Sequence, residues 1–300
     1  MTTGQLQSIN LYYLILAKVR ALMELLKVRL SLLVAFSCAF GYGLATRGDI
    51  NWPTLLMVTL GGFLLSGASV TINQIMEKDL DKLMDRTKGR PLPTGRVTTQ
   101  EAALFSVLCF LLSIWLLWIY TNPLTVLLSI LSMLLYCFAY TPLKRVGPVA
   151  VFVGAIPGAL PPLLGWIAAT GVISHEALII FGIQFIWQFP HFWAIAWVAD
   201  EDYQRAGFKL LPSGEGKSIN TVIQIMVYTL FLIPLGLLPA LFGITGIQSA
   251  VVASVCGAAF FSQTFSLMKT GSRKSAMRIM FGSFLYLPVV QIAFLLDKIN

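Results

Sequence analysis

The chain has 300 residues, of which 57% are hydrophobic and only 11% are charged, and its formal net charge at pH 7 is +8. A soluble domain carries roughly 25% charged residues, so this composition excludes an ordinary soluble protein. The basic charge could suggest nucleic acid as a partner. The bases, however, lie at the ends of long apolar runs, which favours a membrane lipid environment and no nucleic acid.

The N-terminal stretch 5–27 is apolar but contains Lys18, Arg20, Glu24 and Lys27. This mixture is more typical of an interfacial helix than of a membrane span. No short apolar core is followed by a small-residue cleavage site, so no secretory signal is predicted. We therefore expect an N-terminal interfacial segment, residues 1–27, and a single transmembrane domain, residues 28–300.

The rest of the chain predicts an all-α, polytopic bundle of about nine transmembrane helices, because its apolar runs have the length that crosses a bilayer. Breakers such as Asn-Trp-Pro at 51–53 and Thr-Asn-Pro at 121–123 support several span ends. The spans are expected at residues 28–46, 52–73, 102–120, 123–140, 149–169, 177–199, 219–242, 247–268 and 279–296.

With nine spans, 19 of the 21 Lys and Arg residues fall on one side of the membrane. The positive-inside rule then predicts a cytoplasmic N-terminus and an outer C-terminus. Eight of the 13 acidic residues also lie on this side, within 77–85 and 200–215. The rule does not require this second asymmetry, because acids contribute little to topology. The acids therefore call for a chemical explanation.

The first inner loop follows the second span. If the helix continues past the membrane, Asn73, Glu77 and Asp81 fall within an arc of about 80° on one face. Asp85 would extend this face, and Asp79 would point to the other side. Oxygen ligands one turn apart suit Mg²⁺, which proteins hold with one or two carboxylates plus substrate phosphates.

Three bases, Arg86, Lys88 and Arg90, come directly after this stripe. Arginine matches phosphate oxygens bidentately, so acids for a metal stand beside bases for a phosphate. This is the combination that diphosphate chemistry needs. The alternative is a solvated loop whose acids and bases pair with one another.

The inner loop after the sixth span repeats the theme, with acids at 200–202 followed by Arg205 and Lys209. It could supply a second metal position that faces the first, or it could be a plain acidic helix end. The short loop between spans 4 and 5 contains the adjacent bases Lys144 and Arg145. These residues are an anion clamp on one interpretation and ordinary positive-inside residues on the other.

Two spans carry unusual residues. The fifth span contains three prolines and three glycines within 154–165, which indicates either close helix packing or a cavity. The sixth contains Gln184, Gln188 and His191 at helical spacing, hence on one face. Polar residues inside a span tend to face a cavity. His191 could contact an acceptor, ligate iron, act as a base or simply bond to a neighbouring helix.

At these residues the sequence resembles the UbiA-type intramembrane prenyltransferases and, within them, the heme O synthase branch that farnesylates heme b. The similarity includes the stretch 73–95, the segments 140–145 and 154–166, the triplet 191–193, and the stretch 202–212. Each segment is modest alone, but the five occur in the family's order.

The resemblance implies transfer of a farnesyl group from farnesyl diphosphate to a vinyl group of heme b, with addition of water, giving heme O with its hydroxyethylfarnesyl side chain, and diphosphate. It implies Mg²⁺ as the cofactor, the bacterial inner membrane as the location and an active site on the cytoplasmic side. A heme A synthase or a terminal oxidase assembly factor is the protein partner that it suggests.

The resemblance also assigns residues to roles. The expected metal ligands are Asn73, Glu77, Asp81 and Asp202. The expected diphosphate-binding residues are Arg86, Arg90, Lys144, Arg145 and Lys209. His191 and Trp193 are expected on the heme side. The chain departs from the family at two points: position 77 is Glu where Asp is common, and Ala206 stands where a second acid would follow Asp202.

Two alternatives remain open from the sequence. A related prenyltransferase with a quinone precursor, chlorophyllide or another aromatic acceptor would share the donor site. A polytopic transporter is the rival from a different class, but it would usually show charges buried in mid-span or inverted repeats.

Overall fold

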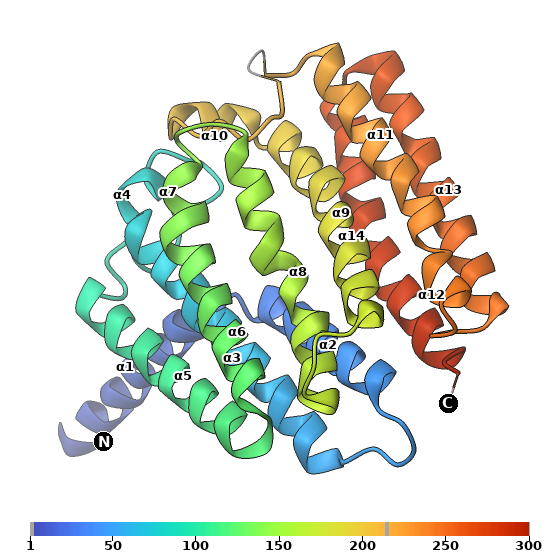
Figure 1. The fold of residues 1–300 in the computed structure, drawn as a ribbon. Helices are drawn as coiled ribbons and strands as arrows, with labels where there is room; N and C mark the ends of the chain where they lie inside the picture. Colours follow the sequence, from blue (N-terminus) through green and yellow to red (C-terminus); the bar gives the residue numbers. More distant parts are fainter. Residues whose placement is uncertain (1–2, 214–215, 300) are drawn as a thin grey trace.

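The computed structural model describes residues 3–213 and 216–299 and shows an all-helical bundle (Figure 1). Within this part of the chain, nine helical segments are long and apolar enough to cross a membrane. This finding confirms the predicted number of spans. The protein is therefore a multi-pass membrane protein, and α1 (Thr3–Leu25) precedes the first span as a separate helix.

The spans follow one another in chain order. They are α2 (Val28–Ala45), α3 (Trp52–Met76), α5 (Thr99–Tyr120), α6 with η1 and α7 (Pro123–Leu134, Leu135–Tyr140, Thr141–Leu143), α8 (Val149–Thr170), α9 (His175–Val198), α11 with α12 (Ile219–Leu235, Leu238–Leu241), α13 (Ile247–Thr270) and α14 (Arg273–Leu296). Two short helices, α4 (Lys78–Asp81) and α10 (Asp200–Arg205), lie in loops. The predicted division of the chain at residue 27 stays a prediction.

Several spans begin at a polar residue that caps the helix. Asn51 accepts a hydrogen bond from the amide of Thr54, and Thr98 forms a reciprocal pair of bonds with Glu101 at the start of α5. Such caps satisfy amides that have no partner within the helix. The third span therefore starts at Thr99, a little earlier than its hydropathy predicts.

The close contact between α2 and α8 explains the glycines of the fifth predicted span. A Cβ atom on Gly165 would overlap the carbonyl of Cys38, and one on Gly41 would overlap the carbonyl of Pro162. Small residues at such positions let two membrane helices approach closely. Between the two alternatives for this part of α8, the structure shows packing.

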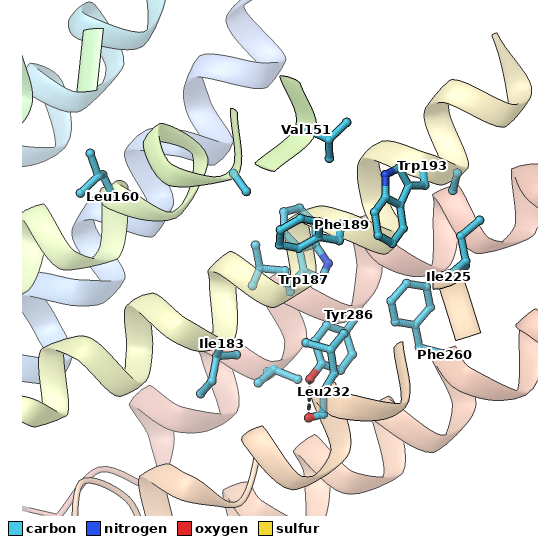
Figure 2. Close-up of a cluster of buried hydrophobic side chains, with 14 of the residues drawn as sticks. Val151, Leu160, Ile183, Trp187, Phe189, Trp193, Ile225, Leu232, Phe260 and Tyr286 are labelled. Carbon is cyan, nitrogen blue, oxygen red and sulfur yellow. Dashed lines mark hydrogen bonds between the residues drawn. The ribbon is translucent and has the colours of Figure 1, made fainter. Parts of the chain in front are cut away.

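The other half of the bundle is held by large apolar side chains. Figure 2 shows aromatic residues of α9 between α8, α11 and α14, with Phe260 of α13 and Tyr286 of α14 in the same cluster. The Tyr286 hydroxyl donates to the carbonyl of Leu232, 3.5 Å away. These contacts fix the position of α9 along α14.

The short helices α4, α7 and α10 gather at one end of the bundle, away from α12 and the C-terminus (Figure 1). Two contacts tie their loops together. Asp202 accepts hydrogen bonds from the amides of Asp85 and Arg86, and the amide of Lys209 donates to the carbonyl of Lys144. The predicted polar loops therefore form one surface.

Candidate functional site

Asn73, Glu77 and Asp81, called the carboxylate stripe below, lie where α3 ends. Glu77 terminates α3 with φ −99° and ψ 7°, and α4 resumes immediately after it. The one-turn spacing survives, because the amide of Glu77 donates to Asn73 and the amide of Asp81 donates to Glu77, at 3.0 and 2.7 Å. Asn73, Glu77 and Asp81 are all buried, with 2%, 5% and 0% of their surface exposed.

The stripe ends at Asp81, so the expectation that Asp85 extends it is wrong. The chain turns after α4, and Asp85 is exposed, where it pairs with Lys88 and Arg205 at 2.6 Å each. These two cations lower the pKa of Asp85 to about 2. A short helix that stops after one turn cannot carry a fourth position on the same face.

Glu77 is bound by Lys144, which comes from the loop after α7. The Lys144 ammonium donates to the two carboxylate oxygens at 2.8 and 3.2 Å and lies 4.8 Å from the centre of the Tyr140 ring. Burial alone would lower the pKa of Lys144, but the Glu77 carboxylate raises it overall. Lys144 is therefore a buried, charged group beside the stripe.

A π-helical turn places Lys144 at this depth. In η1 the amide of Thr141 donates to the carbonyl of Tyr136, five residues back, and Pro142 follows. Such single π turns are frequent at functional sites. Asn73 donates through Nδ2 to the Thr141 hydroxyl at 3.0 Å, and its Oδ1 atom accepts no hydrogen bond from the residues that the structure describes.

Asp81 is bound by Arg90 from the same loop. One guanidinium nitrogen of Arg90 lies 2.9 and 2.8 Å from the two carboxylate oxygens, and the Thr87 hydroxyl donates to the Asp81 carbonyl at 2.9 Å. The 85–91 loop is thus folded back over the stripe. One arginine and one lysine, Arg90 and Lys144, reach the two acids from opposite loops.

Asp202 lies over the first loop, but it does not join the stripe. Its two carboxylate oxygens accept hydrogen bonds from the amides of Asp85 and Arg86, at 3.0 and 3.2 Å. It therefore ties α10 to the loop that carries Arg90. Within the described residues, no group of three or more His, Cys, Asp or Glu side chains is arranged to hold a metal.

The remaining predicted bases are exposed at the rim. Arg86 lies over the Tyr203 ring, 5.9 Å from its centre, while Arg145 and Lys209 have exposed side chains. Asp79 points away from the stripe, as predicted, and pairs with Lys82. The alternative of a solvated loop with paired charges therefore holds for the outer residues 79, 82, 85 and 88. The stripe carboxylates are also paired, with Lys144 and Arg90, but they are buried and not solvated.

Lys27 is a site residue that the sequence did not reveal. It connects α1 to α2 and has φ 45°, the only positive φ of a non-glycine residue in the described chain. A left-handed lysine costs roughly 1–2 kcal/mol. Its side chain forms no hydrogen bond or ion pair within residues 3–213 and 216–299. Burial, with Arg90 and Lys144 nearby, lowers the pKa of Lys27 to about 7.

The helix before Lys27 is fastened to the same loop. Glu24 accepts two hydrogen bonds from Arg96, at 3.0 and 2.7 Å, and Lys18 pairs with Glu101 at 2.8 Å. The Arg96 guanidinium lowers the pKa of Glu24. These pairs hold the α1–α2 corner, and with it Lys27, beside the 82–98 loop. Only the tertiary fold brings residues 24 and 96 together.

The two residues predicted for an acceptor lie on different faces of α9. His191 contacts α14, with Nδ1 2.8 Å from the Ser283 hydroxyl, while Trp193 packs against Tyr228 of α11 at 5.0 Å between ring centres. The aromatic ring beside His191 is Trp187, stacked at 4.4 Å. Residues 187 and 191 are four positions apart in the sequence, a spacing that places two side chains next to each other on a helix.

The chemistry of the stripe fits Mg²⁺. Asn73, Glu77 and Asp81 offer hard oxygen atoms as metal ligands, and the Oδ1 atom of Asn73 has no hydrogen-bond partner within residues 3–213 and 216–299. The two carboxylates are engaged by Lys144 and Arg90, so a metal would take its further ligands from phosphate oxygens. Lys144 and Arg90 are suited to bind the phosphate oxygens of an anion that binds together with the metal.

Comparisons with known proteins show the family of the chain. The UbiA prenyltransferase family model matches residues 34–287. A protein of Cytophaga hutchinsonii named protoheme IX farnesyltransferase is 53% identical over 280 residues, which cover 93% of this chain and 98% of that protein.

Solved structures share the fold. A structure concerned with digeranylgeranylglyceryl phosphate synthase superposes with a TM-score of 0.76 and 19% identity, covering 93% of this chain and 98% of that one. A UbiA homolog from Archaeoglobus fulgidus, bound to DMAPP and Mg²⁺, gives a TM-score of 0.68 at 18% identity, covering 91% and 98%. At such identities the likeness establishes the fold alone.

Proposed function

This chain belongs to the UbiA prenyltransferase family and is a transferase, and from that premise we propose that it moves a farnesyl group from farnesyl diphosphate to the vinyl group of heme b, to which water also adds, releasing diphosphate and yielding heme O. The name and near-complete coverage of the Cytophaga relative support the choice of substrates. The observation that carries the proposal is the buried stripe of Asn73, Glu77 and Asp81 beneath two cations.

The stripe and its cations form the donor end of the site. Asn73, Glu77 and Asp81 would hold Mg²⁺, which when bound neutralises charge that develops on the leaving diphosphate. Lys144 and Arg90 lie within one side-chain length of the proposed metal position, since each already bonds to a carboxylate of the stripe. On donor binding these two cations exchange a carboxylate for a phosphate oxygen, and Lys27 adds a third positive charge.

The rim residues have a weaker, steering role in this proposal. Arg86, Arg145 and Lys209 are exposed, so water and salt screen their attraction for the diphosphate. Asp202 stays a proposed metal ligand only in a state where it releases the amides of residues 85 and 86. In the present structure it positions the loop that carries Arg90.

The apolar bundle protects the reaction from water. Breaking the allylic C–O bond leaves a farnesyl carbocation, which the vinyl carbon must capture before water does. Water then adds to the cation formed on the vinyl group and releases a proton, giving the hydroxyethylfarnesyl side chain. Below the stripe the neighbouring side chains are Tyr136, Tyr140 and Phe192, with ring centres 5.4 and 6.1 Å apart. We place the acceptor beyond these rings, toward His191, and keep Trp193 as a second candidate because its buried indole N–H has no partner among the described residues.

The location follows from the charge asymmetry. We propose the bacterial inner membrane, with the N-terminus and the donor end at the cytoplasmic face, because the bases gather at that end. A heme A synthase or a terminal oxidase assembly factor remains the proposed protein partner.

The test supplies heme b and farnesyl diphosphate to membranes that contain the protein, with Mg²⁺ and with a chelator. We expect heme O, detected by pigment chromatography, only with Mg²⁺. If heme yields nothing and an aromatic acid is prenylated instead, the acceptor assignment is wrong and the alternative branch is correct. Product formation that is equal in the presence of a chelator would overturn the metal assignment.

A further inference from the structure

The corner between α1 and α2 contains a crevice of about 650 Å³. α1 ends at Leu25 and α2 begins at Val28, so the chain turns within two residues, and α1 leads away from the bundle toward the N-terminus (Figure 1). The neighbouring helix α3 holds this corner, because the Thr71 hydroxyl and the Gln74 side-chain amide donate to the carbonyl of Leu25 at 3.4 and 2.8 Å. Buried hydrogen bonds to α3 therefore fix the shape of the crevice.

The walls of the crevice carry three bases and one acid. The acid, Glu24, is already neutralised by Arg96, which donates two hydrogen bonds to it at 3.0 and 2.7 Å. The side chains of Arg20, Lys27 and Arg29 form no hydrogen bond or ion pair within residues 3–213 and 216–299. The crevice therefore has an unbalanced positive charge, which suits an anion.

The rest of the wall is apolar and faces outward. Val19, Met23 and Leu30 line the crevice, with 49%, 45% and 42% of their surface exposed. The crevice also lies directly before the first span, at the level where the headgroups of a bilayer meet its acyl chains. A ligand that is anionic at one end and apolar at the other fits both parts of the wall.

We propose that the α1–α2 crevice binds one anionic phospholipid, with its phosphate among the three bases and its acyl chains against the apolar wall. Basic pockets at the cytoplasmic ends of membrane helices bind such headgroups. The positive-inside rule explains why bases lie at this end of the bundle, but not why three of them surround one crevice without acidic partners. Binding needs neither the prenyl donor nor the acceptor.

The experiment measures lipid binding to the full chain in a neutral detergent, without donor or acceptor. Phosphatidylglycerol and phosphatidylcholine are titrated separately, and native mass spectrometry gives the affinity of the first bound lipid. We expect phosphatidylglycerol to bind at least about 10-fold more tightly. Lys27 also belongs to the donor end, so the variant changes the other two bases. Arg20→Gln with Arg29→Gln should weaken phosphatidylglycerol binding about 10- to 30-fold and leave phosphatidylcholine binding unchanged.

Matched variants separate the crevice from the general positive charge. Lys269→Gln with Arg278→Gln removes the same charge from two exposed bases of α13 and α14. This change should leave the affinity for phosphatidylglycerol within about twofold of the wild type, because water and salt screen distant exposed charges.

A second pair of variants adds an acid and removes no base. Val19→Glu places a carboxylate in the crevice and should weaken phosphatidylglycerol binding about 10-fold, because like charges repel. Leu14→Glu adds the same carboxylate at an exposed position of α1 that does not line the crevice, and it should have no such effect.

Free phosphate, diphosphate and farnesyl diphosphate test the nature of the anion, and none of them should displace the first bound phosphatidylglycerol. Displacement by any of the three would overturn the lipid assignment, and displacement by farnesyl diphosphate would identify the crevice as a donor site. Equal losses in the two double variants, equal affinities for the two lipids, or full affinity in Arg20→Gln with Arg29→Gln would also overturn it. Because no transfer is measured, a failure to form heme O would leave the lipid site standing, and an absence of lipid binding would leave the proposed transfer standing.

Discussion

Two polar clusters lie in the same bundle, and they differ in charge. The charged cluster, Glu77, Asp81, Arg90 and Lys144, lies at the loop end of α3. The amide cluster, Ser37, Gln184, Gln188 and Gln291, lies within the spans of α2, α9 and α14.

The amide cluster is neutral and largely satisfied. Gln291 donates to Gln184 at 2.8 Å and to Ser37 at 3.3 Å, and both Gln184 and Gln188 donate to the carbonyl of Gly158. Neutral groups that pair in this way lie in a bilayer at modest cost, whereas a charge is expensive there. Charge is therefore kept at the loop end of the bundle, and hydrogen bonds between neutral groups join the helices within the spans.

The largest expected effect breaks the charged cluster at its centre. Asp81→Asn should lower heme O formation by about 10³-fold or more, because a lost metal ligand removes several kcal/mol of charge stabilisation. Asp79→Asn removes the same charge two residues away, from an exposed pair with Lys82, and should leave activity near wild type. Pigment chromatography on membranes with matched protein levels measures both. A normal heme O yield from Asp81→Asn would contradict the role of the stripe.

A smaller effect separates the structural part of the Glu77–Lys144 pair from its chemical part. Glu77→Gln or Lys144→Met alone should lower both activity, by about 10²-fold, and the midpoint of thermal unfolding, because one buried charge loses its partner. The exchange Glu77→Lys with Lys144→Glu should recover much of the unfolding midpoint but no activity. If the exchange also restores activity, the pair serves the fold only.

The pH dependence of the same pair has a definite sign. The pKa of Lys144 is raised in the folded protein, so its contribution to stability is present below the ordinary lysine value of 10.5 and is lost only as the pH rises above it. The stability difference between the wild type and Glu77→Gln/Lys144→Met, which removes both charges of the pair together, should therefore stay constant between about pH 6 and pH 9. A difference that collapses within this range would contradict the assignment.

Lys27 should show a trade between stability and donor binding. Lys27→Gly relieves the left-handed backbone and should raise the unfolding midpoint above that of Lys27→Ala, while both variants raise KM for the donor by several-fold. Because the folded pKa is lowered to about 7, the unfolded chain binds more protons from there to 10.5, and wild-type stability should rise with pH across this window. In both variants the stability should rise less with pH across this window than in the wild type, because the Lys27 ammonium is absent. An unchanged KM for the donor in both variants would show that Lys27 is not part of the site.

The smallest effect tests the amide cluster. Gln291→Leu should cost about 1 kcal/mol of stability and leave activity within about threefold, with no dependence on salt or pH, because neutral hydrogen bonds in membranes are weak. Gln263→Leu is the matched control, since the Oε1 atom of Gln263 is buried without a partner among the described residues, and this variant should not destabilise the protein. A loss of activity above about 10-fold for Gln291→Leu would mean that the amide cluster takes part in the chemistry.

Local pattern predicted much of the site. The spacing of residues 73, 77 and 81 was sufficient, because a helix places every fourth residue on one side whatever surrounds it. The same reasoning failed at Asp85, since the sequence does not announce that α4 ends after one turn. It also did not show that Trp193 and His191 lie on different faces of α9, since a two-residue step brings Trp193 to α11 while His191 contacts α14. The assignment of Trp193 to the acceptor stays a prediction.

The sequence by itself determined the nine spans, the grouping of charge at one end and the carboxylate stripe, because hydropathy and periodicity are properties of each segment alone. Only the tertiary structure decided the partners. Lys144 reaches Glu77 through a π turn, Lys27 enters the site through a strained corner, and Ser283 contacts Nδ1 of His191. Each of these contacts joins segments far apart in the chain, and the packing of the helices sets their distance and direction.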